Sequence, residues 1–586
     1  MGRTGDGDAP IRHMTARSSR AIKTGYQRFE RPVYDYAAKY APCRRGCPAG
    51  HDTAWATCMI SKGRYDLALR VLREENPFPS VTGRVCHHPC EDACSRGDYD
   101  QPVAIQALER ACAEYGDTDP VELAPRLHEE SVGIIGAGPA GLACAYHLVR
   151  LGYPVTVYDA NDTPGGILAY GIPAYRLPRE VLETEIDRLR RMGVAFRCGV
   201  RIGVDLSFAQ LRQSHHALFL APGLARARQL SVLMPKDPRV ESGVAFLRAA
   251  RLGVARSVSG HVVVIGGGDV GIDAARSALR LGAEKVTLCC GEARTEMPAH
   301  PEEIEAARHE GVEILDRVVP ARVDATRNSV NLTLLPVRAM RRDPDGTPRF
   351  DVEEGPGWQI RAARLLYAVG QEADLSFLPP SLAQGQRLRV DAWGQTSLPG
   401  VFAGGDITGA YGVAEAVGSA KRAVIGIDAW LRRLPMEGLE ELVAVGDSPI
   451  VSMHAYHAYR HGERVIPSRT EVRIDEINLD YFPPAARARP REVDPEIRAS
   501  GFLEVALPLS ADEAREEAGR CFNCGTCNMC GNCFIFCPDS SVFQRPDWGF
   551  AIDLDHCKGC GVCVEECPRQ AMSMVPESES VSEGCE

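Results

Sequence analysis

The stretch SVGIIGAGPAGLACAYHLVRLGYPVTVYDA, residues 131–160, decides the fold of this chain. It consists of an apolar strand, a turn with Gly136, Gly138 and Gly141, an alanine-rich helix and a second strand. These glycines allow a tight turn, close approach to a pyrophosphate at the helix N-terminus, and close helix–strand packing. Asp159 ends the second strand and is placed to accept a ribose hydroxyl. The stretch predicts a dinucleotide-binding βαβ unit; the alternative is a glycine-rich turn in another α/β domain.

A second copy of the pattern follows as HVVVIGGGDVGIDAARSALRLGAEKVTLCC, residues 261–290. Gly266, Gly268 and Gly271 take the roles of the three glycines in the first copy. Two such units predict two bound dinucleotides in one chain. We expect one to be a flavin and the other a nicotinamide.

Two segments after the second unit indicate that the flavin domain resumes. The first is AVGQ, which contains Gly370, and the second is GVFAGGD, residues 400–406, followed by the helical sequence GVAEAVGSAKRAVIGI. This order resembles flavoproteins in which an FAD domain is interrupted by a pyridine-nucleotide domain. The resemblance implies that Gly405 and Asp406 close the FAD site, with the carboxylate on the flavin ribityl chain. Taken alone, Asp406 would be a turn residue.

Eight cysteines near the C-terminus fall into two runs of the form C-x2-C-x2-C-x3-C-P. The first three cysteines of each run bind one iron–sulfur cube, and the fourth binds the other cube. Zinc knuckles or disulfides are the alternatives, but zinc sites need no following proline. We therefore expect two [4Fe–4S] clusters in a module that resembles the bacterial two-cluster ferredoxins. The ligands of the first cluster would be Cys527, Cys530, Cys533 and Cys567, and those of the second Cys557, Cys560, Cys563 and Cys537.

Composition narrows the class of protein. The 586 residues carry a formal charge of -11, with 45% hydrophobic and 25% charged residues, which suits an ordinary globular protein and argues against nucleic-acid binding. No apolar stretch approaches the roughly 20 residues of a membrane span, and the N-terminus lacks the apolar core of a secretory signal. The 22 cysteines are mostly grouped at ligand spacing. We expect a cytoplasmic protein without a membrane span.

Further motifs resemble the small subunit of glutamate synthase and the flavin half of dihydropyrimidine dehydrogenase. They are PGGILAYGIPAYRLP at residues 164–178, NPFP at 76–79 and TGRVC at 82–86, and the resemblance covers roughly residues 40–435. It implies that Gly166 and Leu168 contact FAD. It also implies an N-terminal helical domain with two [4Fe–4S] clusters. The flavin would then accept a hydride from the nicotinamide, and single electrons would leave through the clusters.

The N-terminal cysteines depart from that family, because the first half of its C-x2-C-x4-C-x3-C-P motif is missing. Residue by residue, the resemblance still implies one cluster, whose ligands would be Cys47, Cys86, Cys90 and Glu109. The second cluster keeps only Cys43 and Cys94. Either Cys521 and Cys524 fold back to complete it, or that site is lost and these four cysteines are structural. We therefore expect about three clusters, or four if the chain folds back.

The nicotinamide domain also departs from the family. Members that use NADPH carry two arginines after the second strand, which bind the 2′-phosphate. Here Gly291 and Glu292 occupy these positions. A carboxylate repels the phosphate and accepts hydrogen bonds from a free ribose, so NADH is favoured over NADPH, although Arg294 could replace the missing arginines.

The combined prediction is an α/β protein with a helical Fe–S domain, two Rossmann-like domains and a ferredoxin-like domain. The expected segments are a helical Fe–S domain (1–125), the FAD domain (131–235 and 365–435) around the NAD(P)H domain (236–364), a linker (436–515) and a 2[4Fe–4S] ferredoxin-like domain (516–576). The chain would be an NADH:acceptor oxidoreductase subunit that passes electrons, in either direction, between NAD(P)H and a partner. The partner would be an enzyme of the dissimilatory sulfite reductase type, a 2-oxoacid oxidoreductase or a ferredoxin, with a homodimer left open. The alternatives are a glutamate synthase small subunit and a non-catalytic electron-wire scaffold.

Overall fold

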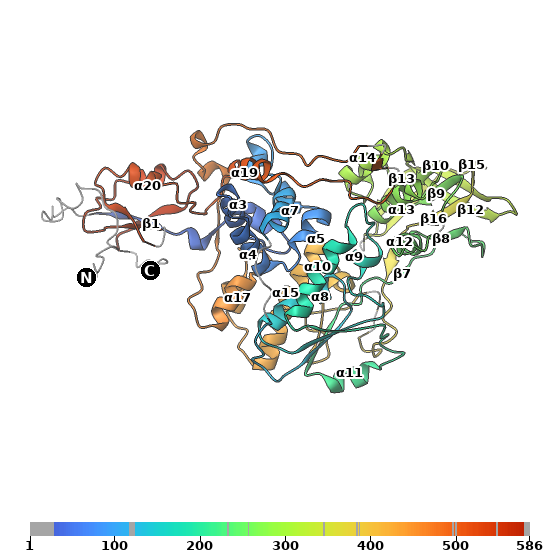
Figure 1. The fold of residues 1–586 in the computed structure, drawn as a ribbon, viewed down its shortest axis with the longest axis horizontal. Coiled ribbons are helices and arrows are strands. Elements are labelled where there is room, and N and C mark those ends of the chain that lie inside the picture. The colour runs from blue at the N-terminus through green and yellow to red at the C-terminus, as the bar shows by residue number, and fades with distance from the viewer. Residues whose placement is uncertain are drawn as a thin grey trace, which may run out of the picture.

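The computed structural model describes most of residues 28–578. Within that span it omits 117–122, 231, 233, 256, 344–345, 383–384, 386, 495–496, 499–500 and 547–548. The N-terminal stretch in which no secretory signal was expected lies outside the described residues. Among the described helices, none has the length and apolar character to cross a membrane. The molecule is elongated, with β1 and α20 at one end of its long axis and β9 and β10 at the other (Figure 1).

Short helices form the N-terminal region, and proline opens three of them because its fixed φ suits the first turn. The helix α3 begins after Asp52, whose carboxylate accepts the Trp55 N–H at 3.2 Å. The elements are η1 (Tyr36–Ala38), β2 (Lys39–Tyr40), α2 (Pro42–Gly46), α3 (Thr53–Ser61), α4 (Tyr65–Glu75), α5 (Pro79–Val85), α6 (Pro89–Asp92), η2 (Ser95–Asp98) and α7 (Ile105–Gly116).

The first parallel sheet has the strand order β18-β6-β3-β4-β5. Its strands are β3 (Val132–Ile135), β4 (Val155–Asp159), β5 (Ala195–Cys198), β6 (Ala217–Leu220) and β18 (Val401–Ala403). Every residue of β3 and β6 is buried, as expected for the central strands of a parallel sheet covered on both faces. The surrounding elements are α8 (Pro139–Arg150), α9 (Ile167–Tyr170), α10 (Arg179–Arg191), α11 (Phe208–Ser214), η4 (Gly405–Thr408) and α15 (Val413–Arg432).

The second parallel sheet has the order β11-β10-β9-β16-β8. Its elements are β8 (Val240–Ser242), α12 (Gly243–Arg251), β9 (His261–Ile265), α13 (Asp269–Arg280), β10 (Lys285–Cys289), η3 (Arg294–Glu296), α14 (Pro301–His309), β11 (Glu313–Leu315) and β16 (Arg364–Tyr367). The structure differs here from the expected boundary at residue 364, because β16 pairs with β9 and β8 of this sheet. The chain returns to the first sheet only after this strand.

A separate antiparallel sheet packs against the second parallel sheet, and two further strands connect the two parallel sheets. The antiparallel sheet consists of β12 (Val318–Ala325), β13 (Val330–Arg342), β14 (Pro348–Val352) and β15 (Trp358–Ala362). The two crossings between the sheets, β7 (Arg226–Ala227) and β17 (Gln371–Glu372), pair with each other.

The ferredoxin-like end contains a strand from the opposite end of the chain. Its elements are β20 (Val542–Gln544), β21 (Phe550–Ile552), α20 (Asn532–Ile535), α21 (Val562–Glu565) and β22 (Met572–Pro576). The strand β1 (Glu30–Tyr34) pairs antiparallel with β22 over its whole length. The expected helical domain therefore gives its first residues to the ferredoxin-like sheet.

The structure also differs from the expectation of a linker over residues 436–515. The segment contains α16 (Leu439–Val443), α17 (Met453–Arg460), β19 (Thr470–Glu471), η5 (Ile474–Glu476) and η6 (Leu479–Tyr481), and is followed by α19 (Ala511–Gly519). Met453, Tyr456 and Val472 are fully buried in the main core. The segment is held in place because these apolar side chains are buried, away from water, against residues of the helical domain.

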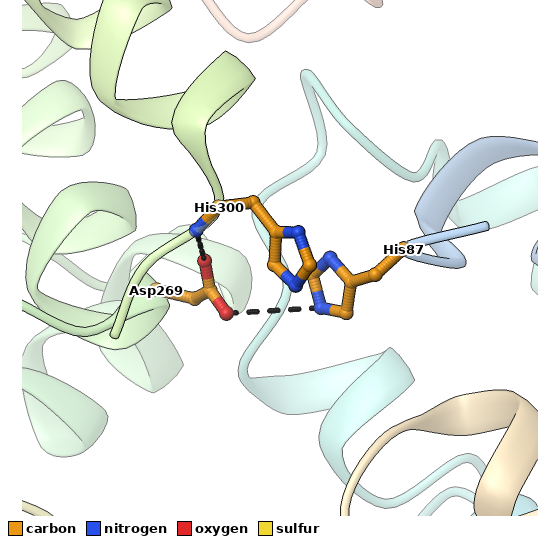
Figure 2. Close-up of side chains that lie close together, drawn as sticks. All are labelled: His87, Asp269 and His300. Carbon is orange, nitrogen blue, oxygen red and sulfur yellow. Dashed lines mark hydrogen bonds and ion pairs between the residues drawn. The ribbon is translucent and has the colours of Figure 1, made fainter. Parts of the chain in front are cut away.

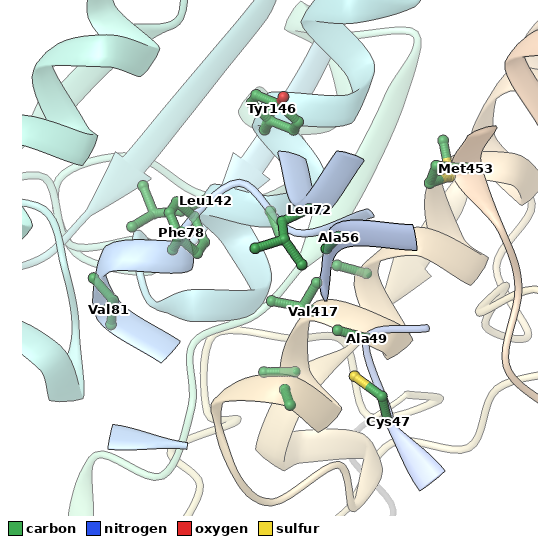
Figure 3. Packing of buried hydrophobic residues seen from close by; sticks show 14 of the residues in the cluster. Cys47, Ala49, Ala56, Leu72, Phe78, Val81, Leu142, Tyr146, Val417 and Met453 are labelled. Atoms are coloured by element: carbon green, nitrogen blue, oxygen red, sulfur yellow. The ribbon is translucent and has the colours of Figure 1, made fainter. Parts of the chain in front are cut away.

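One hydrophobic core joins the helical region to the first sheet. Figure 3 shows Phe78 of the helical region near Leu142 of α8 and Leu72 near Val417 of α15, and Met453 of α17 belongs to the same cluster. At Gly418 a side chain would strike the Pro48 carbonyl oxygen at 2.2 Å, so α15 passes directly against the loop after Cys47.

A buried ion pair lies inside this core. Lys421 of α15 donates to Glu75 of α4 at 2.5 Å and to the Ala49 carbonyl at 2.6 Å. Glu75 also accepts from Ser452 at 2.6 Å and from the Met453 N–H at 2.8 Å, at the start of α17. Burial alone would raise the pKa of Glu75, but the charges of Lys421 and Arg44 lower it to about 2. The pair thus connects three separate parts of the chain.

We expect Lys421→Met to destabilise the protein by about 3–5 kcal/mol, because it leaves the Glu75 carboxylate buried without its counter-charge. Chemical denaturation followed by far-UV circular dichroism measures the effect. The matched control is Arg473→Met, which removes the exposed pair of Arg473 with Asp475 and should leave the midpoint nearly unchanged. Equal midpoints for the Lys421 variant and the wild type would contradict this role of the pair.

Candidate functional site

The first glycine turn is closed to any side chain at two of its three glycines. Gly136 has φ +100°, and a Cβ there would lie 2.1 Å from the Ala221 carbonyl oxygen. A Cβ on Gly141 would lie 1.9 Å from the Gly136 carbonyl oxygen. At Gly138 the nearest atom is the Gly166 Cα at 4.0 Å, so space remains above the N-terminus of α8. This is the cradle that a pyrophosphate needs.

Asp159 holds the glycine turn from the end of β4. One carboxylate oxygen accepts the Ala137 N–H at 2.7 Å, and the other accepts the Asn161 N–H at 2.8 Å. The second oxygen also accepts from the Asn161 side-chain amide at 2.9 Å, so a ribose hydroxyl would bind at the oxygen that faces Ala137. The carboxylate therefore orders the turn in addition to its expected role.

Asp406 lies close to this turn, because a Cβ on the preceding Gly405 would lie 3.0 Å from the Ala140 Cβ of α8. The Gly405 N–H donates to Ser419 at 2.9 Å, which fixes the segment on α15. Burial raises the pKa of Asp406 to about 6. A half-buried carboxylate beside a dinucleotide cradle fits a hydrogen bond from a ribityl hydroxyl.

Gly166 and Leu168 lie on the other side of the cradle. Gly166 has φ +55°, and a Cβ there would lie 2.7 Å from the Gly138 Cα. Leu168, in α9, is fully buried. The structure thus brings together the residues that the sequence assigns to FAD.

The second glycine turn repeats these constraints. A Cβ on Gly266 would lie 2.3 Å from the Ala368 carbonyl oxygen, and one on Gly271 would lie 2.1 Å from the Gly266 carbonyl oxygen. Gly268 is open, with Pro298 at 3.9 Å. Gly370 has φ +103° and lies against Arg228, after β16. A second dinucleotide fits at the N-terminus of α13.

Glu292 follows β10, where the family places arginine. It is buried, and its carbonyl accepts the Arg317 N–H at 3.0 Å. The guanidinium of Arg294 approaches the Ile314 carbonyl at 3.3 Å, and its backbone N–H donates to Asp316 at 3.1 Å. Arg294 is therefore held against β11 in this structure.

The eight C-terminal cysteines line two cavities. Cys527, Cys530, Cys533 and Cys567 line one, and Cys557, Cys560, Cys563 and Cys537 line the other. This grouping is the interleaved one that the spacing predicts. The backbone N–H of Ser541 lies 3.2 Å from the Cys537 sulfur, and that of Ala571 lies 3.3 Å from the Cys567 sulfur. Four thiols with N–H donors around each cavity fit a [4Fe–4S] cube.

In the helical region the side chains of Cys47, Cys86, Cys90 and Glu109 interact with one another through their charges. Burial raises the pKa of Cys86, and the charges of Glu109 and Cys47 raise it further. Burial likewise raises the pKa of Cys90, and the charges of Cys47 and Cys43 raise it further.

Glu109 is positioned by its own hydrogen bonds. One carboxylate oxygen accepts from Thr82 at 2.7 Å and from Asn76 at 3.2 Å, and burial raises the pKa of the side chain to about 8. Three thiols and one oriented carboxyl form a donor set that fits a cluster.

The chain does fold back to the two remaining N-terminal cysteines. Burial raises the pKa of Cys43, and the charges of Cys94, Cys521 and Cys524 raise it further. The Cys524 sulfur also lies 3.9 Å from the hydroxyl oxygen of Ser95, the residue after Cys94. Burial raises the pKa of Cys521 and of Cys524 to about 12 each, with Cys94 a contributor in both cases. Four converging thiols fit a further cluster, which the sequence left as one of two interpretations.

Hydrogen bonds fix the fold-back segment on the helical region. The buried Arg96 donates to the Arg520 carbonyl at 2.5 Å, and Arg520 pairs with Asp100 at 3.0 Å. Asn523 donates to the Ala54 carbonyl of α3 at 2.8 Å. The segment that carries Cys521 and Cys524 is therefore part of the helical region in space.

A histidine pair connects the helical region to the second sheet (Figure 2). His87, beside Cys86, stacks on His300 with ring centroids 3.4 Å apart and planes 3° from parallel. The carboxylate of Asp269, at the start of α13, lies 3.7 Å from the His87 ring nitrogen Nε2 and accepts the backbone N–H of His300 at 3.1 Å. These donors are close enough for a metal ion. The stacked rings form a contact between the helical region and the second sheet.

Two functional side chains escaped the sequence analysis. Lys421 stands within an apolar run of α15, and a lone lysine in such a run is a signal for a buried ion pair. Tyr34 lies 3.3 Å from the Cys533 sulfur, at a separation of 499 residues. No local pattern could have revealed that contact.

Comparison with known proteins gives three family matches. Residues 130–425 match the pyridine nucleotide-disulphide oxidoreductases, residues 35–120 match the 4Fe-4S cluster domain II of dihydropyrimidine dehydrogenase, and residues 550–573 match the 4Fe-4S binding domain.

Curated relatives extend over most of the chain. The NADPH-Fe(3+) oxidoreductase subunit beta of Geobacter sulfurreducens is 36% identical over 535 residues, 84% of this chain and 76% of the relative. The NADP(+)-dependent formate dehydrogenase subunit beta of Moorella thermoacetica is 39% identical over 426 residues, 67% and 60%. The NAD-dependent dihydropyrimidine dehydrogenase subunit PreT of Salmonella typhimurium is 32% identical over 397 residues, 67% and 91%.

The fold-back site generates a prediction about iron content. With four clusters, the anaerobically purified chain should hold about sixteen irons, and the double variant Cys521→Ser/Cys524→Ser about twelve. The control Cys198→Ser changes a half-buried cysteine at the end of β5 and should keep the wild-type content. If the double variant also kept that content, these cysteines would not be ligands.

Proposed function

Because this chain belongs to the pyridine nucleotide-disulphide oxidoreductase family, we propose that it oxidises NADH and delivers single electrons to a partner redox protein. It is an FAD-dependent NAD(P)H oxidoreductase with iron–sulfur clusters. When bound, FAD takes two electrons from NAD(P)H as a hydride, leaving NAD(P)⁺, and the clusters carry these electrons away one at a time, with release of the proton.

The observation that supports electron exit is the continuous series of cysteine sites between the first sheet and the far end of the molecule. Cys47 begins the loop that packs on α15. The helix α2, which carries Cys43, packs closely on α6, which carries Cys90, since a Cβ on Gly46 would lie 3.3 Å from the Cys90 Cα. Cys524 and Cys527 lie on one short segment. This series would place one cluster beside the flavin and the last at the ferredoxin-like end (Figure 1).

The chain's own residues have distinct tasks in this proposal. Asp159 and Asp406 orient the flavin nucleotide, and the glycine turns admit the two pyrophosphates. Lys421 and Glu75 hold the Cys47 loop against α15, close to the flavin. Glu109 would complete the first cluster site.

We infer NADH as the electron donor from the environment of Glu292. Its carboxylate occupies the position where a 2′-phosphate would need a cation, and Arg294 is held at β11. Two of the relatives are named for NADPH or NADP(+) and one for NAD. Their names therefore support a nicotinamide dinucleotide as the donor, and the choice of NADH rests on Glu292.

The partner is proposed at the ferredoxin-like end. Cys530 and Cys560 are exposed there, and Ile535 and Phe536 are 65% and 45% exposed. The relatives are named as subunits, which supports a partner protein. We propose a sulfite reductase-type enzyme, a 2-oxoacid oxidoreductase or a ferredoxin, in the cytoplasm, where reduced thiols persist.

Coenzyme choice tests the donor. Steady-state kinetics should give a kcat/KM for NADH at least about tenfold above that for NADPH, since a carboxylate repels the phosphate. Glu292→Arg should raise kcat/KM for NADPH, and the control Glu292→Gln should raise it less. A wild type that prefers NADPH would contradict the proposed donor.

Electron exit is tested by removing the last cluster site. Cys557→Ser/Cys563→Ser should leave NADH-dependent bleaching of the FAD absorbance and the reduction of ferricyanide intact, because both need only the dinucleotide sites. Reduction of a bacterial 2[4Fe–4S] ferredoxin should fall at least about tenfold. Full-rate ferredoxin reduction by this variant would place the exit elsewhere.

A further inference from the structure

The strand β1, from the N-terminal part of the chain, contributes the side chain of Tyr34 to the ferredoxin-like module. Its five residues pair with β22, with Tyr34 opposite Met572. Arg28 secures the start of the segment, donating to the Cys557 carbonyl at 2.9 Å and pairing with Glu577 at 2.9 Å. Lys39 secures its end, donating to the Gln570 carbonyl at 2.9 Å.

Tyr34 reaches a candidate cluster ligand from this strand. Its hydroxyl oxygen lies 3.3 Å from the Cys533 sulfur, and its ring lines the same cavity as Cys527, Cys530 and Cys567. A cysteine that binds iron is a thiolate and has no proton to give. A tyrosine keeps its proton at neutral pH, so the hydroxyl donates and the sulfur accepts.

The backbone hydrogen bonds to sulfur are alike in the two halves of the module, whereas the cation Arg28 interacts with Cys557 of the second site. Cys537 and Cys567 each accept from the N–H four residues later, at 3.2 and 3.3 Å. Cys563 is the counterpart of Cys533 in the repeat, and among the described residues no side chain donates to its sulfur. The Tyr34 hydroxyl therefore distinguishes one cluster from the other.

We propose that Tyr34 raises the reduction potential of the cluster held by Cys527, Cys530, Cys533 and Cys567. A hydrogen bond to a ligand sulfur stabilises the reduced cluster, which carries one more negative charge. This cluster is the one whose run begins next to Cys524, so it is the first that an electron from the fold-back site meets. The inference rests on the proposed function only for the identity of the four ligands.

The test is a redox titration of the full chain, purified anaerobically and followed by electron paramagnetic resonance. In Tyr34→Phe, which removes only the hydroxyl oxygen, the midpoint potential of one cluster should fall, that of its neighbour should stay, and the iron content should not change. The matched control is Tyr40→Phe, on the same N-terminal segment as Tyr34. It removes a hydroxyl that interacts with the Glu471 carboxylate of the neighbouring strand β19. It should leave both potentials at their wild-type values.

Three outcomes would overturn the inference. Unchanged potentials in Tyr34→Phe, or an equal fall in Tyr40→Phe, would show that this hydroxyl does not set the potential. Loss of iron in Tyr34→Phe would assign Tyr34 a structural role instead. Absence of the paired cluster signals from the wild type would contradict the proposed ligands themselves, and with them the proposed function.

Discussion

The ion pair between Lys421 and Glu75 is the constraint on which the arrangement of the proposed redox sites depends. Both side chains are almost completely buried, at 0% and 2% exposure, and a buried charge without a partner is strongly destabilising. Lys421 comes from the helix after the flavin-closing segment, Glu75 from the helical region, and Ala49 from the loop after Cys47. The contacts of the Lys421 ammonium group therefore hold the candidate cluster site at Cys47 against α15, next to the proposed flavin site.

The second constraint acts at the other side of the helical region. Arg96, Asp100 and Arg520 form a buried network that brings Cys521 and Cys524 to Cys43 and Cys94. The strand β1 then returns the N-terminal segment to the ferredoxin-like sheet. The chain therefore crosses between the helical and ferredoxin-like parts twice, and the proposed cluster sites lie along these crossings. Removal of either crossing segment would disturb two sites together.

The sequence predicts the dinucleotide units well, because the glycine positions are dictated by local backbone contacts. A Cβ on Gly141 or Gly271 would collide with a carbonyl five residues earlier. The C-terminal cysteine groups also follow from spacing alone. The sequence alone could not decide whether Cys521 and Cys524 fold back, because the fold-back depends on a contact between Arg96 and Arg520, more than 400 residues apart. The segment 436–515 is misjudged from sequence because its few apolar side chains are buried by other parts of the chain.

The central claim is that a two-electron site is connected to four one-electron sites in one chain. Anaerobic coulometric reduction of the purified protein measures this most directly, because it counts electrons without assuming a partner. The account predicts about six electrons per chain, two for the flavin and one for each cluster. An uptake of about two electrons, as expected for a flavin alone, would contradict it.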